Sequence, residues 1–185
     1  MAKKKPPSQR PDEAPAPPPE NAIYTLKVYL IGGPVEDEYA DQEISRTIQI
    51  RGRQTLADLH EAIYQAFDRE EEHLYEFQFG KGPHDPSGLR FTLDPGSLTS
   101  LTGRKPPGDV LTTTLDALGL VVGQSFGYWF DFGDDWMHQI DVEAIGEAPA
   151  EERFPKLVNA VGPSPPQYPD YDEDEDETDD EDDEM

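Results

Sequence analysis

The stretch Phe126-Gly-Tyr-Trp-Phe-Asp-Phe-Gly-Asp-Asp-Trp-Met-His138 decides the fold that this sequence predicts. Its first half alternates aromatic residues with others, so a strand would place four rings on one face. Gly133-Asp134-Asp135 is typical of a tight turn, because Gly and Asp tolerate the backbone angles that a reversal needs. The alternation then resumes with His138 in phase with apolar residues, so the stretch predicts a β-hairpin with one buried face. The four rings belong to Phe126, Tyr128, Phe130 and Phe132, and the second strand continues the buried face with Ile140, Val142 and Ala144.

Outward from the hairpin, similar patterns predict four more strands and three helices. The clearest helix starts at Leu56, because the Thr55 hydroxyl can accept a hydrogen bond from the Asp58 amide and a carboxylate suits the first turn. Apolar residues follow at helical spacing to about Phe67. The predicted strands cover 23–31, 44–50, 73–79 and 89–93, and the other helices cover 115–118 and 151–161.

The order of these elements predicts an α+β domain, with a mainly antiparallel sheet and one long helix covering a face of the sheet. We expect this domain to occupy residues 22–169. Residues 1–21 are rich in Pro and Lys, and residues 170–185 are nearly all Asp and Glu. Neither segment offers apolar surface to offset the loss of conformational entropy, so we expect both tails to be disordered.

The chain is strongly acidic, with a formal net charge of −25 at pH 7. The tail explains only part of this charge, since residues 21–169 hold 24 acidic and 11 basic residues. A duplex-binding surface normally needs a basic patch, so the charge argues against direct binding of nucleic acid. A metal ion, or a basic protein partner reached through the acidic tail, fits the charge better. A tail that only solubilises the protein is the alternative.

The chain contains no cysteine, which excludes disulfides, thiolate catalysis and cysteine-ligated zinc sites. Lys3-Lys4-Lys5 precedes prolines rather than an apolar segment, which is not typical of a secretory signal. No apolar run approaches the ~20 residues of a membrane span. We therefore expect a cytoplasmic protein without membrane association.

Three blocks of the sequence carry a resemblance to a known family. They are Leu59-His-Glu-Ala-Ile63, His73-Leu-Tyr-Glu-Phe77 and Tyr128-Trp-Phe-Asp-Phe-Gly-Asp-Asp-Trp-Met-His138. Their order and spacing resemble the plasmid pRiA4b ORF-3-like family over about residues 22–169, and Phe154-Pro-Lys-Leu-Val158 and Pro165-Pro-Gln-Tyr-Pro169 resemble its C-terminal end. The resemblance implies a compact α+β domain associated with plasmids and mobile elements, and it implies no particular reaction.

Three histidines, His60, His73 and His138, lie on or beside the apolar phase of their predicted elements. Imidazoles converging from a helix, a strand and a hairpin could bind Zn or Fe, with Asp131 or Asp135 as a further ligand. The alternative is three histidines at the edge of the core, each hydrogen-bonded to a carbonyl or carboxylate. The lack of a close ligand pair such as H-x-x-x-H favours this alternative.

Four residues of the hairpin are candidate binding residues: Trp129, Asp131, Asp135 and Trp136. The carboxylates could act in acid–base chemistry or bind metal, although Gly-Asp-Asp is also ordinary turn chemistry, which we favour for Asp134. Asp131 and Trp129 lie out of phase with the ring stripe. This phase allows Asp131 to be exposed and makes Trp129 the better candidate for an exposed contact. The rings could stack on bases, but a hydrophobic core explains the stripe more simply.

The leading functional hypothesis is a non-enzymatic accessory domain that interacts with another protein. It follows from the negative charge, the lack of a recognisable catalytic constellation and the family resemblance. The first alternative is a metal-dependent, hydrolase-like enzyme that uses His60, His73 and His138 with Asp131 or Asp135. The second alternative is a DNA-associated factor for the maintenance of mobile elements, which predicts salt-sensitive DNA binding.

Overall fold

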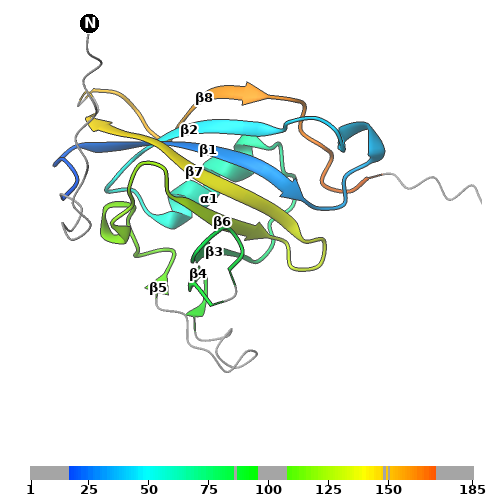
Figure 1. Ribbon diagram of the computed structural model, residues 1–185, viewed down its shortest axis with the longest axis horizontal. Coiled ribbons are helices and arrows are strands. Elements are labelled where there is room, and N and C mark those ends of the chain that lie inside the picture. The colour runs from blue at the N-terminus through cyan, green and yellow to red at the C-terminus, as the bar shows by residue number, and fades with distance from the viewer. Residues whose placement is uncertain (1–16, 86, 96–107, 148, 150, 170–185) are drawn as a thin grey trace, which may run out of the picture.

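The computed structural model describes residues 17–85, 87–95, 108–147, 149 and 151–169. In this part of the chain, eight strands form one sheet in the order β5-β4-β3-β6-β7-β1-β2-β8, with helix α1 packed on one face (Figure 1). The strands are β1 (Ala22–Gly32), β2 (Ser45–Arg51), β3 (Tyr75–Phe79), β4 (Leu89–Thr92), β5 (Gly108–Asp109), β6 (Ser125–Phe130), β7 (Trp136–Glu147) and β8 (Lys156–Val161). The helical elements are α1 (Leu56–Ala66) and the 3-10 turns η1 (Asp37–Tyr39) and η2 (Asp116–Leu118).

The predicted fold class, a mainly antiparallel sheet under one long helix, is wrong. The sheet is mixed, because β5 joins β4 in parallel while the other neighbouring strands pair antiparallel. The helix is short: α1 has 11 residues, and the chain leaves it at Asp68, whose φ of 53° is left-handed. Among the described residues, no helix combines the length and the apolar character that crossing a membrane requires.

Strand β8 occupies the segment in which the sequence predicted a terminal helix. Lys156–Val161 pairs antiparallel with β2 and forms one edge of the sheet. Its Leu and Val residues suit an extended chain, and pairing with β2 satisfies backbone groups that a short isolated helix would have to satisfy alone. Strand β5 likewise lies in a segment for which the sequence predicted no strand. Of the two predicted disordered tails, residues 1–16 and 170–185 lie outside the described residues.

The predicted hairpin is confirmed as β6 and β7, which pair through Tyr128 opposite His138 and Phe130 opposite Trp136. The connecting turn starts at Asp131, two residues earlier than predicted, because Asp131 already has a left-handed φ of 56°. Phe132 therefore leaves the buried stripe and packs against Trp129, with ring centroids 4.5 Å apart. The stripe contains three rings instead of four.

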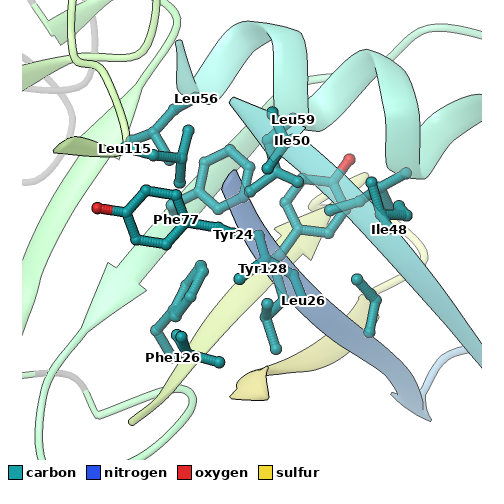
Figure 2. Close-up of a cluster of buried hydrophobic side chains, with 14 of the residues drawn as sticks. Tyr24, Leu26, Ile48, Ile50, Leu56, Leu59, Phe77, Leu115, Phe126 and Tyr128 are labelled. Atoms are coloured by element: carbon teal, nitrogen blue, oxygen red, sulfur yellow. The ribbon is translucent and has the colours of Figure 1, made fainter. Parts of the chain in front are cut away.

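The core lies between α1 and the face of the sheet that carries this stripe. The predicted N-terminus of the helix is confirmed as a capping box, in which Thr55 accepts from the Asp58 amide and the Asp58 carboxylate accepts from the Thr55 amide. Leu56 and Leu59 then point from α1 onto the sheet (Figure 2). The largest fully buried side chains are Trp136, Tyr24, Tyr128, Phe67, Phe77, Phe126, Phe130, Leu26, Ile48, Ile50, Leu56 and Leu59.

Candidate functional site

The three histidines surround the rings of Tyr128 and Phe130, but each has its own environment. The ring centroids of His60 and His73 lie 6.1 Å and 5.9 Å from that of Phe130, and His138 lies 5.2 Å from Tyr128. Within the described part of the chain, no group of three or more His, Asp or Glu side chains is arranged to hold a metal ion. The metal site therefore stays a prediction from the sequence.

His60 lies between a carboxylate and a buried hydroxyl. Its Nε2 is 3.3 Å from Glu72 Oε2, and its Nδ1 is 2.7 Å from the Tyr128 hydroxyl. A carboxylate–imidazole–hydroxyl series activates the nucleophile in many hydrolases. Here burial raises the pKa of Tyr128 well above its ordinary value, and only 1% of the side chain is exposed. The hydroxyl stays protonated and out of reach of a substrate, so the series supports the core instead of supplying a nucleophile.

His73 lies at the surface and joins the hairpin turn to the C-terminal segment. Its Nε2 is 3.4 Å from Asp131 Oδ2 and 2.9 Å from the Tyr168 hydroxyl, which in turn donates to Glu71 over 3.1 Å. Asp131 is buried, contrary to the exposure that its phase allowed, and its other oxygen accepts from the Gly133 amide. Of the predicted ligands, only His73 and Asp131 are thus brought together.

The other candidate binding residues of the hairpin divide into a partly accessible pair and a buried residue. Trp129 donates from Nε1 to Asp135 Oδ1 over 3.0 Å, with Asp135 exposed and Trp129 half-buried. Trp136 is fully buried beneath the guanidinium of Arg69, whose carbon lies 3.5 Å from the centroid of the indole. Asp134 lies in the turn, as its sequence context predicted.

His138 is enclosed by the core and electrically neutral at physiological pH. Burial, reinforced by the positive charge of Arg69, lowers the pKa of His138 to about 3. Arg69 was not among the predicted site residues, although the sequence carries one signal: Arg69 is the only basic residue in the charged run 68–72. A lone arginine among carboxylates is usually solvated, so its burial follows from the tertiary packing alone.

A groove of about 380 Å³ lies between α1 and β8. Its acidic rim includes Glu61, which is exposed, and Asp58, which also serves the capping box. The one basic residue of the groove, Lys156, has its ammonium 3.5 Å from Glu152, so its charge is largely balanced. The lining consists of Ile48, Asp58, Glu61, Ala62, Gln65, Ala66, Pro155, Lys156 and Leu157.

The outer edge of β8 borders this groove. All six residues of β8 are exposed, and its apolar side chains Leu157, Val158 and Val161 are exposed by 49%, 43% and 36%. Strand β8 ends the sheet, so its outer backbone groups pair with no other strand of the described residues. Neither the groove nor the open edge was predicted from the sequence, because residues 151–161 were predicted to form a helix where β8 lies.

Comparison with known proteins finds a family model, a relative and a solved structure that resemble this chain. A family model described as plasmid pRiA4b ORF-3-like protein matches residues 23–179. The uncharacterized protein y4hQ of Sinorhizobium fredii (strain NBRC 101917 / NGR234) is 27% identical over 149 residues, which cover 79% of this chain but 66% of that relative. A similar fold is found in the crystal structure of a protein of unknown function, MM3350 from Methanosarcina mazei Go1, with a TM-score of 0.61 and 23% sequence identity. The match covers 80% of this chain and 73% of the MM3350 chain. That likeness concerns the fold.

Proposed function

This chain belongs to the plasmid pRiA4b ORF-3-like family, and from that premise we propose that it is a non-enzymatic accessory protein of plasmids or mobile elements. In this proposal it acts in the cytoplasm, where its domain binds an extended, basic segment of a partner protein. The observation that carries the proposal is the exposed outer edge of β8 beside the acidic groove under α1.

The edge of β8 supplies backbone hydrogen bonds for such a segment. An extended peptide can add to an open sheet edge as a further strand, and alternate side chains then enter neighbouring pockets. Beside β8 the neighbouring pocket is the groove, whose apolar floor includes Ile48 and Leu157. Burial of the exposed apolar side chains of β8 would favour the complex.

The charge of the groove favours a basic segment over an acidic one. Asp58 and Glu61 face the groove, while the charge of Lys156 is balanced by Glu152. The whole chain is strongly negative, so a basic partner is also attracted at long range. The acidic residues of 170–185, which lie outside the described residues, would add to this attraction.

An irregularity in β8 restricts which segments fit. Leu157 lies opposite Ile48 and Asn159 lies opposite Thr47, so Val158 has no partner residue on β2. A bulge of this kind interrupts the regular edge and discourages indiscriminate pairing between strands. The side chains that enter the groove, more than the backbone alone, would therefore select the partner.

The proposal is tested with fluorescein-labelled ten-residue peptides of alternating Lys and Val, measured by fluorescence anisotropy against the full chain. Matched peptides contain Glu in place of Lys, or Gly in place of Val. We expect the Lys–Val peptide to bind, with affinity falling as salt increases, and both matched peptides to bind at least about tenfold more weakly, a difference of about 1.4 kcal/mol.

Two substitutions locate the binding surface. Glu61→Lys reverses the charge of the groove without disturbing the capping box, and Leu157→Asp places a charge on its floor. The control Glu143→Lys makes the same change of net charge at an exposed position of β7, which β1 and β2 separate from β8. Equal binding by Glu61→Lys and Glu143→Lys, or equal affinity for the Lys and Glu peptides, would contradict the proposal.

A further inference from the structure

Three arginines are buried among the described residues, Arg46, Arg51 and Arg69, and the surroundings of Arg46 and Arg69 differ. Arg46 is 4% exposed and donates to the carbonyls of Ala66, Ser45, Val161 and Gly162 and to the Ser164 hydroxyl. Arg69 is 7% exposed and donates from Nη1 to the Pro165 carbonyl over 3.3 Å. Its Nε and Nη2 have no hydrogen-bond partner among the described residues. One guanidinium is therefore satisfied by the protein and the other is not.

The side chains next to Arg69 share this lack of partners. The guanidinium lies over the Trp136 ring at 3.5 Å, and the indole Nε1 of Trp136, which is 0% exposed, has no partner in the described part of the chain. His138 lies two residues further along the same face of β7 and is 1% exposed. Backbone groups of Tyr128 and Trp136 lie close enough to raise the pKa of His138, but neither forms a hydrogen bond of normal geometry with the ring nitrogens. Arg69, which lies over Trp136 and whose charge acts on His138, is thus next to two other buried side chains whose nitrogens have no hydrogen-bond partner among the described residues.

The charge of Arg69 is offset only in part, by the longer-range attraction of Asp68. Burial lowers the pKa of Arg69 to about 10, which still leaves the guanidinium positively charged at neutral pH. No carboxylate forms an ion pair with it among the described residues, and the adjacent Asp68 is exposed and accepts from the Ser164 hydroxyl. Native proteins rarely bury a charge without a partner, because the loss of hydration is costly.

We propose that Arg69, Trp136 and His138 form a binding site for a small inorganic anion such as chloride. Arg69 and Trp136 offer only N–H donors, so the ligand must accept hydrogen bonds, and the charge of Arg69 requires it to be negative. The ligand must also be small, because none of the three side chains is more than 7% exposed. This site is independent of the groove and of the function proposed for it.

The first test follows the fluorescence of Trp136 in the full chain with Trp129→Phe, which leaves one tryptophan. Sodium bromide is exchanged for sodium methanesulfonate at constant ionic strength, since bromide quenches an indole that it contacts and methanesulfonate is a larger anion. We expect two components of quenching. One saturates as bromide fills the site, and the other, from collisions, increases linearly with bromide concentration. Arg69→Met in this background should remove the saturable part, and Arg53→Met, at an exposed position, should keep it. Quenching that is only linear, or the same in Arg69→Met, would overturn the proposal.

Two further measurements do not depend on these variants folding. The Tm of the unmodified chain should rise and level off as chloride replaces methanesulfonate, since a ligand of the folded state stabilises that state. Crystals grown with bromide should give an anomalous peak within hydrogen-bonding distance of Arg69 Nε. An unchanged Tm together with no peak at this position would overturn the proposal.

The acidic residues of 170–185 are a second source of negative charge, and a chain ending at Pro169 distinguishes them. The same saturable response in the full and shortened chains would support a free anion. A response that arises only in the shortened chain would mean that a carboxylate of this segment occupies the site in the full chain, and it would overturn the proposal of a free anion.

Discussion

The imidazole of His60 stacks on the ring of Tyr75, with centroids 3.6 Å apart and planes 5° apart. The stacking fixes the orientation of the imidazole, so that Nδ1 meets the Tyr128 hydroxyl and Nε2 meets Glu72. Through its imidazole, His60 of α1 therefore contacts Tyr75 of β3 and Tyr128 of β6. Burial lowers the pKa of His60, although Glu72 opposes this effect, and the neutral ring suits an aromatic neighbourhood.

Tyr128→Phe should destabilise the domain by about 1–3 kcal/mol, because it leaves His60 Nδ1 buried without a partner. Urea denaturation followed by circular dichroism measures this change in the free energy of unfolding. Tyr64→Phe is the matched control, since Tyr64 is only half-buried, and we expect it to change stability by less than about 0.5 kcal/mol. Equal effects of the two substitutions would show that the hydrogen bond to His60 contributes nothing.

His138 should make the domain sensitive to acid. Its pKa is about 3 in the folded state and about 6.5 when unfolded, so the unfolded chain binds a proton more readily below pH 6.5. The stability that it contributes is therefore complete above pH 6.5 and is lost as the pH falls toward 3, by up to about 1.4 kcal/mol per pH unit.

This sensitivity is measured by urea denaturation at pH 7, 6, 5 and 4. His138→Gln should weaken the dependence of stability on pH, whatever its effect on stability at pH 7. The pKa of His60 and that of His84 are lowered in the same direction, so the variant should retain part of the dependence. An unchanged slope would refute the role of His138.

Thr55→Ala should destabilise the domain by about 1 kcal/mol, because it removes the side-chain half of the capping box. The Thr55 hydroxyl accepts from the Asp58 amide over 3.1 Å. Thr112→Ala is a suitable control, since Thr112 is exposed and its hydroxyl makes only a 3.4 Å contact with the Asp109 carbonyl. The two free energies of unfolding, compared by urea denaturation, should differ clearly, and a difference of zero would rule out the cap as a source of stability.

Arg46→Lys should destabilise the domain by about 2–4 kcal/mol and loosen β8. The planar guanidinium donates at once to Val161, Gly162 and Ser164, and the single ammonium of lysine cannot match that geometry. Hydrogen exchange followed by mass spectrometry should show faster exchange in 156–164 than in β6. The exposed Arg53 provides the control Arg53→Lys, for which exchange should not change, and uniform acceleration across the sheet in Arg46→Lys would contradict this local role.

The sequence predicted best where the local pattern and the tertiary structure agree. The alternation around Phe126 and Tyr128 is a property of neighbouring residues, so the hairpin could be predicted, and the same holds for the capping box at Thr55. The prediction that Phe132 belongs to the buried stripe was wrong, because the left-handed backbone at Asp131 ends the strand before Phe132. A single sequence gives the phase of a strand more readily than the residue at which the strand stops.

Features that depend on distant partners could not be predicted. Lys156–Val161 forms a strand because β2 offers it an edge, and nothing in its own residues specifies that pairing. For the same reason the groove, which Lys156 and Leu157 of β8 help to line, could not be predicted. His60 and His138 are buried, as the apolar phase of their elements predicted, whereas His73 lies at the surface before β3. The spacing of the three histidines could not reveal that they face three different sets of neighbours. Arg69 resembled a surface residue in every local respect.

The strand order has a consequence for how the chain is made. Strand β1, which is synthesised first, pairs with β7 on one side and with β2 on the other, while β8 closes the edge beyond β2. Gln167 then accepts from the amides of Glu70 and Glu71, tying the end of the domain to the turn after α1. Contacts between residues so far apart in sequence form slowly. A ribosome must therefore release nearly the whole domain before the sheet can close, and until then β1 and β2 remain available to chaperones, proteases or other nascent strands.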